Sequence, residues 1–196
     1  MNTRTLNPAN AADASRAIDT LVTAFAADPA VRWMYPLAQQ YLEHFPDFAR
    51  AFGGNAIAAG TADYAEGFAG AALWLPPGVQ PDEQRVVEVL QRSVAAEKQA
   101  EVFSLLEQMG RFHPPGPHWY LPLIGVDPRA QGRGCGSALL RHALERCDRE
   151  ELPAYLESTN PRNIALYERH GFRALGEIRA GSSPVIVPML RDAHSN

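Results

Sequence analysis

Hydrophobic residues in the first half of the chain recur mainly at helical spacing. Apolar side chains at every third or fourth position predict a helix that ends at Asp28-Pro29, because the residue before a proline disfavours helical geometry. A later stretch is rich in small and aromatic residues and ends at Pro76-Pro77-Gly78, which is typical of strands bounded by a turn. The predicted elements are helices over 13–27, 39–52 and 81–109, the last broken near Glu97, and a strand, turn and strand over 64–75.

The second half alternates apolar strands with helices. His118–Val126 is apolar nearly throughout, as expected of a strand covered on both faces. Pro122 within it indicates either an edge strand or a bulge that turns the strand away from its neighbour and opens a slot, because proline cannot donate to a sheet. Further predicted elements are helices over 137–149 and 161–170, and strands over 154–157, 172–178 and 185–189. This order predicts an α/β fold with a sheet of mixed direction.

Composition excludes several classes of protein. The 196 residues favour one domain, and a net charge of -4 gives no basic footprint for nucleic acid. No apolar run is long enough to span a membrane, and the N-terminal residues lack the apolar middle of a signal peptide. The two cysteines are too few for a disulfide framework and lie in no metal-ligand cluster, so we expect reduced thiols, no metal and a cytoplasmic location.

A glycine-rich loop is the strongest chemical signal. It joins the apolar strand to the next helix and reads Gln131-Gly132-Arg133-Gly134-Cys135-Gly136-Ser137. Glycines let a ligand approach the backbone, and the first N–H groups of a helix have no partners within it, so the loop predicts a phosphate site. Arg133 would add a charged hydrogen bond. The alternative is a turn that merely packs the helix against the sheet.

The kind of phosphate ligand stays open on spacing alone. The glycines are one residue away from the dinucleotide fingerprint, with Glu157 at about the right distance. Against that fingerprint, five residues from Asp127 to Gln131 separate the strand from the glycines, and the motif lies late in the chain. A Walker loop is excluded because no Gly-Lys-Ser/Thr follows.

Two motifs in the correct order resemble the GCN5-related N-acetyltransferase (GNAT) family. The first is Gln131-x-x-Gly134-x-Gly136 after the strand, similar to the family's acetyl-CoA pyrophosphate loop. The second is Asn160 seven residues before Tyr167, followed by Gly171-Phe172. The resemblance is strong over about 118–178 and implies a GNAT-like mixed central sheet with flanking helices and a helical insertion before the cofactor-binding half. His-Trp-Tyr-Leu at 118–121 and Leu-Trp-Leu-Pro-Pro at 73–77 are most similar to puromycin N-acetyltransferase-like members.

The resemblance implies roles for residues on the acetyl-CoA side. N–H groups from Gln131 to Ser137, with Gly132, Arg133, Gly134, Cys135 and Gly136 between them, would bind the pyrophosphate. Backbone groups of Ile124, Gly125 and Val126 would pair with the pantetheine arm like an extra strand, and the N–H near Val126 would polarise the thioester carbonyl. Asn160 would hold the cofactor arm, and Tyr167 would be the general acid for the leaving thiolate. We expect Cys135 to pack beside the loop and Cys147 to be a core residue.

The acceptor side is less defined. We expect Glu157 to be the general base that deprotonates the acceptor amine, with His113, His118, Asp28 and Glu66 as further candidates. Residues 1–117 would form mostly the acceptor side and the helical insertion, and 118–196 the acetyl-CoA-binding half, of one acyltransferase domain over 1–196. Candidates to line the acceptor pocket are Trp33, Tyr35, Trp74 and Trp119.

The sequence thus predicts an enzyme that transfers an acetyl group from acetyl-CoA, as co-substrate, to a primary amine of a small molecule or peptide by direct attack. Two alternatives remain: a non-catalytic acyl-CoA-binding module, and a nicotinamide-dinucleotide-dependent oxidoreductase. We expect no nucleic-acid or membrane partner, and a homodimer is possible.

Overall fold

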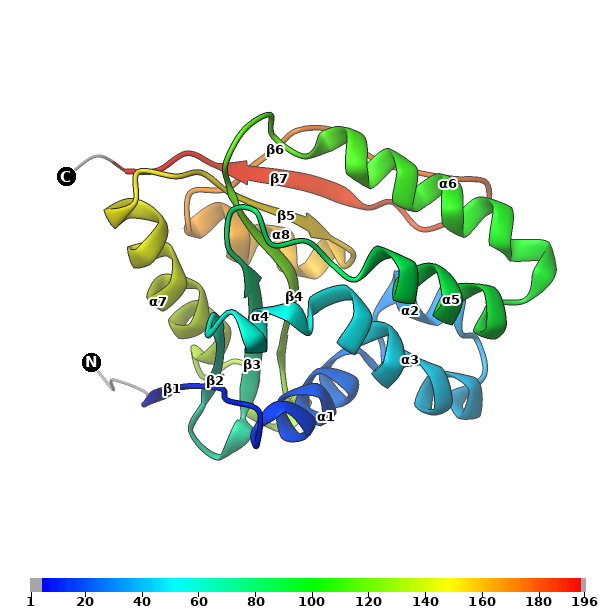
Figure 1. The fold of residues 1–196 in the computed structure, drawn as a ribbon, viewed down its shortest axis with the longest axis horizontal. Coiled ribbons are helices and arrows are strands. Elements are labelled where there is room, and N and C mark those ends of the chain that lie inside the picture. Colours follow the sequence, from blue (N-terminus) through cyan, green and yellow to red (C-terminus); the bar gives the residue numbers. More distant parts are fainter. Residues whose placement is uncertain (1–4, 195–196) are drawn as a thin grey trace.

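The computed structural model describes residues 5–194 as a mixed sheet flanked by helices (Figure 1). Seven strands lie in the order β1-β2-β3-β4-β5-β7-β6; β4 and β5 are parallel and all other neighbours are antiparallel. The strands are β1 Leu6–Pro8, β2 Ala62–Ala65, β3 Gly70–Leu75, β4 Trp119–Val126, β5 Ala154–Ser158, β6 Arg173–Ala174 and β7 Val187–Arg191. The α-helices are α1 Ala14–Phe25, α2 Pro29–Met34, α3 Ala38–Gly53, α4 Asn55–Ala58, α5 Glu83–Ser93, α6 Ala96–Phe112, α7 Cys135–Arg149 and α8 Pro161–Arg169. The fold confirms the predicted mixed α/β class.

Two hydrophobic clusters cover the two faces of the sheet. One joins the sheet to α1, α3, α5 and α6, and the other joins it to α7 and α8. Cys135 and Cys147 are both buried in the second cluster, as expected. Burial raises the pKa of the Cys147 thiol to about 12, so this thiol is a core group that does not ionise at neutral pH. The glycine-rich loop and the helical insertion therefore lie on opposite faces of the sheet.

Helix α1 packs unusually close to β4. A Cβ at Gly125 would lie only 2.5 Å from Cβ of Ala24 and 3.2 Å from Cδ2 of Leu21. Glycine therefore lets the helix backbone approach the strand at this point. This close packing holds α1 against β4, the strand that contains Pro122.

The predicted elements are largely confirmed, with three omissions and small shifts. The strand predicted over 172–178 is an exception, because only Arg173–Ala174 (β6) is strand there and Ile178 forms an isolated bridge with Ile186. The short elements β1, α2 and α4 were not predicted. The break in the helical insertion falls at Val94 and Ala95, just before the expected Glu97, and α7 begins at Cys135 instead of Ser137. Within residues 5–194 no helix is long and apolar enough to cross a membrane. The same residues contain no group of three or more His, Cys, Asp or Glu side chains placed to hold a metal ion.

Candidate active site

A bulge at Pro122 splits the centre of the sheet. Parallel pairing of β4 with β5 covers only Trp119, Tyr120 and Leu121 and then stops. On its other side β4 shifts register against β3, because two residues between Tyr120 and Leu123, Leu121 and Pro122, oppose the single residue Trp74 between Leu75 and Leu73. The prediction of a bulge that opens a slot is confirmed. The edge-strand interpretation is wrong, since β4 is the middle strand of the sheet.

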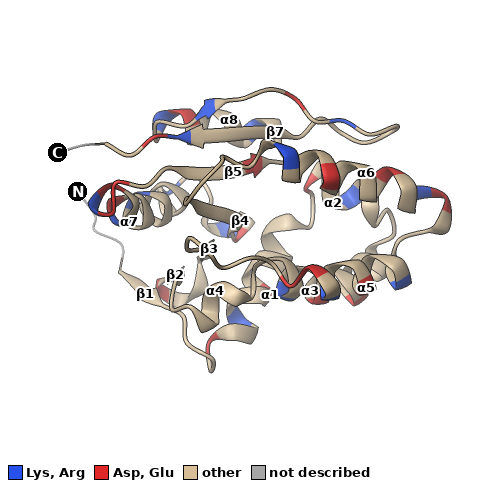
Figure 2. Cartoon of the chain, turned by 45° about the horizontal axis from the view of Figure 1, so that its top comes forward, with Lys and Arg blue, Asp and Glu red and all other residues tan. Residues whose placement is uncertain are grey.

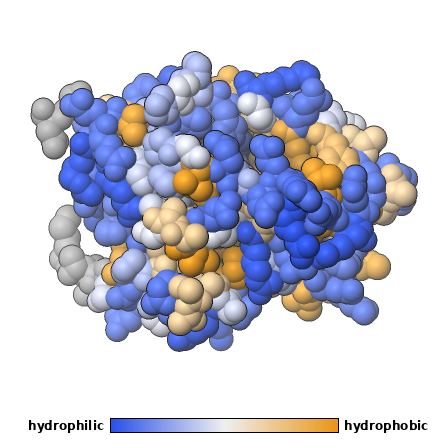
Figure 3. Space-filling view, viewed as in Figure 1, coloured by the Kyte–Doolittle hydropathy of each residue, from blue (hydrophilic) through white to orange (hydrophobic). Residues whose placement is uncertain are grey.

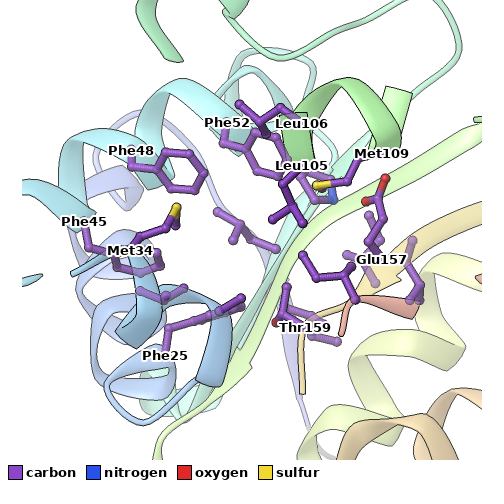
Figure 4. A pocket seen from close by; sticks show the side chains of 18 of the residues that line it. Phe25, Met34, Phe45, Phe48, Phe52, Leu105, Leu106, Met109, Glu157 and Thr159 are labelled. Carbon is purple, nitrogen blue, oxygen red and sulfur yellow. The ribbon is translucent and has the colours of Figure 1, made fainter. Parts of the chain in front are cut away.

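The slot opens into an apolar cavity of about 80 Å³ (Figure 4). Phenylalanines of α1 and α3 and apolar side chains of α6 form its walls, and Figure 4 shows Glu157 and Thr159 on the side opposite Phe45 and Phe48. Ile124 and Tyr167 also line this cavity. Of the described residues that line it, Glu157 alone carries a carboxylate or a basic side chain. The predicted acid, the predicted base and one predicted pantetheine-binding residue thus border one space.

Glu157 is almost fully buried and held by aromatic neighbours. Its side chain is 3% exposed, and the Tyr120 hydroxyl donates to Oε2 at 2.9 Å. Burial and this carboxylate raise the pKa of Tyr120, which therefore stays a hydrogen-bond donor. Oε1 is buried and accepts no hydrogen bond from the described residues, but Nε2 of His113 lies 3.4 Å away. A buried carboxylate in this position needs a proton or a cation beside it.

Two histidines continue from Glu157 towards the surface. Nδ1 of His113 lies 3.1 Å from Nε2 of His118, whose Nδ1 lies 2.8 Å from the carbonyl oxygen of Gly116. A carbonyl oxygen only accepts, so the network assigns the hydrogen to Nδ1 of His118 and makes its Nε2 the acceptor for His113. Nε2 of His113 then faces Oε1 of Glu157. Both atoms carry lone pairs, so this contact is attractive only when a hydrogen lies between Nε2 and Oε1. Burial lowers the pKa of His118, which favours the neutral ring that this pattern requires.

A second pocket, of about 510 Å³, adjoins the first at Glu157. Phe52, Leu106 and Met109 border both pockets, as Glu157 does. The second pocket lies between α5 and α6, and His113, His118 and Tyr120 form part of its wall. Of the four described residues that border both the central cavity and this second, outer pocket, Glu157 alone carries a carboxylate or a basic side chain.

The glycine-rich loop has the backbone form that the sequence predicts. Gly132 and Gly134 have φ values of 72° and 80°, and a Cβ at either position would meet nothing within 4 Å. Gly134 precedes α7 without any side-chain cap, and the first-turn N–H groups of Gly136 and Ser137 have no acceptors within the helix. The loop is thus exposed and open at its backbone, which fits an anionic group. Arg133 and Gln131 are exposed beside it.

Other predicted residues are held by contacts within the protein. The Asn160 side chain caps α8 by accepting from the N–H of Arg162, and it lines neither pocket. The Gln131 amide donates to the carbonyl of Val126 at 3.3 Å, and the hydroxyl of Ser137 contacts Nε2 of His170 at 2.7 Å. Gly125 and Val126 border neither pocket. A ligand at these residues would therefore contact mainly backbone groups, the amide N–H groups of Asn160 or the amide oxygen of Gln131.

Two further candidates for the base do not lie at the slot. Asp28 is buried, caps α2 through the N–H groups of Ala30 and Val31, and accepts from the Thr159 hydroxyl at 2.7 Å. Burial raises its pKa. Glu66 is exposed in the turn between β2 and β3. Neither residue borders the described pockets.

The four aromatic residues expected to line the acceptor pocket border neither pocket. Trp33 donates to Ser182, Trp119 donates to Glu150, and Tyr35 and Trp74 are fully buried. The phenylalanines of α1 and α3 provide the aromatic wall instead. These phenylalanines were not among the candidates, because no sequence signal distinguishes a core phenylalanine from one that borders a cavity.

Comparison with known proteins agrees with this geometry. Residues 104–172 match the acetyltransferase (GNAT) family. A crystal structure from Corynebacterium glutamicum, of histone acetyltransferase HPA2 and related acetyltransferase, is 30% identical with a TM-score of 0.71, covering 99% of this chain and 98% of that one. Arylalkylamine N-acetyltransferase 2 of Aedes aegypti has the same fold, with a TM-score of 0.68 over 98% of this chain and 100% of that chain, at 14% identity.

Curated relatives match only the central segment. Mycothiol acetyltransferase of Beutenbergia cavernae is 51% identical over 55 residues, which are 26% of this chain and 18% of that protein. The chain spans less than a quarter of the length of the curated relatives that it matches first. With the full-length structural relative, these matches show that the chain belongs to the GNAT family of acetyltransferases. The predicted family and enzyme class are confirmed.

Proposed function

We propose that this acetyltransferase moves an acetyl group from acetyl-CoA to a primary amine of a small molecule or peptide by direct attack. One observation carries the proposal: the bulge at Pro122 opens a slot whose lining includes both Tyr167 and Glu157. A thioester in that slot would meet a phenol and a buried carboxylate in one small, apolar space. Such a site excludes water and strengthens each polar interaction inside it.

Residues on the α7 and α8 side would bind acetyl-CoA, which supplies an activated acetyl group as a thioester. Backbone N–H groups of residues 131–137, together with Arg133, would bind the pyrophosphate. The edge of β4 from Ile124 to Val126, unpaired with β5, would bind the pantetheine arm. Asn160 would contribute its amide N–H groups, since its oxygen caps α8.

Tyr167 would stabilise the leaving sulfur. It is 5% exposed, and burial followed by the charge of Asp28 raises its pKa, so the phenol keeps its proton at neutral pH. A coenzyme thiol resembles cysteine, with a pKa of about 8.5, so complete proton transfer from the phenol would be uphill. We infer that Tyr167 acts first as a hydrogen-bond donor to the developing thiolate, while the N–H near Val126 polarises the carbonyl.

Glu157 would take the proton from the acceptor ammonium. The amine nitrogen then attacks the carbonyl carbon and the carbon–sulfur bond breaks. The second proton that the nitrogen loses on becoming an amide goes to the leaving thiolate, so that amide and thiol are the products. The proton taken up by Glu157 would move to the unprotonated Nε2 of His113. Nδ1 of His113 would at the same time give its hydrogen to Nε2 of His118, and the Nδ1 hydrogen of His118, at the exposed turn beside Gly116, would leave to water. His113 and His118, expected as alternative bases, serve in this proposal as the route for the proton.

The proposal also keeps four predictions made from the sequence. They are a single acyltransferase domain over 1–196, a cytoplasmic location, a possible homodimer, and a specific likeness to puromycin N-acetyltransferase. Non-catalytic acyl-CoA binding is the less favoured alternative, because a module that only binds needs no carboxylate at the end of the slot. In Tyr167→Phe, turnover should fall sharply with acetyl-CoA affinity unchanged; unchanged turnover would contradict the proposed role.

A thermal-shift titration tests the cofactor. Acetyl-CoA should raise the melting temperature with dose, since a ligand that binds only the folded state stabilises it. NADH, run in parallel, should leave the melting temperature unchanged. A rise with NADH alone would instead support the dinucleotide-dependent oxidoreductase, and no rise with acetyl-CoA would contradict the proposed function.

A further inference from the structure

The outer pocket extends from the protein surface to Glu157, so an acceptor molecule could approach the carboxylate through it. It lies on the face of the sheet opposite the glycine-rich loop, between α5 and α6, and ends at the carboxylate shared with the central cavity. Its outer lining is exposed at Glu83, Val87 and Gly110, with Val87 38% exposed. Figure 3 shows hydrophobic residues at the surface between the positions of α5 and α6. A molecule can thus reach Glu157 without passing the loop.

The charges along this pocket have one sign. Its fifteen described lining residues include three carboxylates, Glu83, Glu107 and Glu157, two histidines, and neither lysine nor arginine. Acidic residues occur on both helices that flank it (Figure 2). Arg111 pairs with Glu107 at 2.6 Å at the rim, so the net negative potential comes chiefly from Glu83 and Glu157. An ammonium group is attracted to such a pocket and a carboxylate is repelled.

The walls between the mouth and Glu157 are mostly apolar. They are formed by Phe52, Val86, Phe103, Leu106 and Met109. The Tyr120 hydroxyl at the inner end already donates to Glu157. A sugar ring would lose the hydration of several hydroxyl groups here with few partners to replace it. An alkyl or aryl group would bury its surface without that loss.

We infer that the outer pocket is the acceptor-binding site and that it selects a primary amine on an apolar body without an acidic group. The ammonium lies at Glu157 and the apolar body lies between α5 and α6. This inference rests on the proposed function and makes its acceptor more specific. The sequence leaves open amino-nucleosides, aminoglycosides, polyamines and peptide amines. The outer pocket disfavours acceptors of these classes that carry many hydroxyl groups or a carboxylate near the amine.

Blocking variants test the position of the site. Gly110 lines the pocket within α6, and a Cβ there would meet nothing within 4 Å, so Gly110→Trp adds bulk without a clash in the core. Val87→Trp narrows the opposite wall from α5. Ala100→Trp is the matched control, because Ala100 is exposed on α6 outside both pockets. With 2-phenylethylamine as acceptor, kcat/KM should fall about tenfold or more in both blocking variants and stay unchanged in the control.

The substrate arm compares 2-phenylethylamine with phenylalanine, which differ by one carboxylate. Wild-type protein should prefer the amine by about tenfold or more. Equal activity of the blocking variants and the control would overturn the position of the site, and equal use of phenylalanine would overturn its selectivity; both results leave the proposed function intact. If acetyl-CoA stabilises the protein but no amine is acetylated, the proposed function fails and the inference fails with it. An unchanged thermal shift with acetyl-CoA in each variant confirms that the cofactor side is folded.

Discussion

At the scale of single residues, the site depends on one carboxylate in an unusual position. Glu157 lies at the junction of two pockets, receives a hydrogen bond from Tyr120, and faces His113 with an oxygen that accepts no hydrogen bond from the described residues. Removing water from a carboxylate is unfavourable unless a proton or a cation compensates. An incoming ammonium provides both a cation and a proton, which is why this position suits a general base.

Replacing Glu157 with Gln should lower kcat by about a hundredfold or more, the range for loss of a general base. Gln keeps the size of the side chain but cannot take up the proton. Steady-state kinetics with a fixed amine measures the effect, and Glu145→Gln, an exposed change on α7, is the control. A loss of less than about tenfold would exclude Glu157 as the base.

The histidine pair predicts a pH effect. Protonated His118 cannot accept from His113, so the wild-type rate should fall as the pH drops through the pKa of His118. Burial lowers that pKa, which places the fall below the ordinary value of 6.5. In His118→Gln, kcat should be lower and this fall should disappear, with the KM for acetyl-CoA unchanged. An identical pH profile in the variant would contradict the proposed transfer of the proton from Glu157 through His113 to His118.

The sequence predicts the identity of these residues better than their contacts. Tyr167 follows from the motif that ends in Gly171-Phe172, and Glu157 from its place at the end of a strand. The contact of Glu157 with His113 could not be predicted, because it joins the end of α6 to β5 across about 44 positions. No local periodicity encodes such a long-range contact.

At the scale of elements, replacing each of two glycines with alanine should change the free energy of unfolding in opposite directions. Gly125→Ala should lower the free energy of unfolding by about 1–3 kcal/mol, because the new methyl group would overlap Ala24 and push α1 from β4. Gly110→Ala should raise it by about 0.5–1 kcal/mol, since the helical position is open and alanine favours helix. Denaturant unfolding of both variants measures the two shifts. Equal shifts would contradict the close packing of α1.

The elements missed by the sequence analysis are short. Helix α2 has six residues, and Asp28-Pro29 was interpreted only as the end of the preceding helix. The same pair also begins α2: the Asp28 carboxylate caps it and Pro29 is its first residue. That signal was present in the sequence and could have predicted a helix start. Strand β1 has three residues and is set by pairing with β2, which the sequence does not reveal.

At the scale of the whole molecule, a partly buried ion pair ties the C-terminal part to the helix that follows the glycine-rich loop. Arg191 of β7, 5% exposed, donates to both carboxylate oxygens of Asp148 of α7, at 2.7 and 2.8 Å. These hydrogen bonds hold the pKa of Asp148 below its ordinary value of 3.8. The pair therefore contributes stability above that value, and the contribution is lost as the pH falls through the lower pKa of the folded state.

Asp148→Asn should reduce the free energy of unfolding by about 1–3 kcal/mol at pH 7. As the pH falls through the lowered pKa of Asp148, the difference from wild type should shrink, because the wild-type carboxyl is then protonated and uncharged as well. Unfolding curves across this pH range measure both effects. A difference that stays constant down to the lowest pH would show that charge on Asp148 is not the cause.

The central claim is transfer of an acetyl group to an amine, and product analysis tests it most directly. Purified protein would be incubated with acetyl-CoA and 2-phenylethylamine, with released thiol and N-acetylated amine quantified together by colorimetry and mass spectrometry. We predict one N-acetylated amine per released thiol, with thiol release dependent on the amine. Thiol release at the same rate without amine, or binding of acetyl-CoA with no acetylated product from this or any other primary amine, would contradict the account.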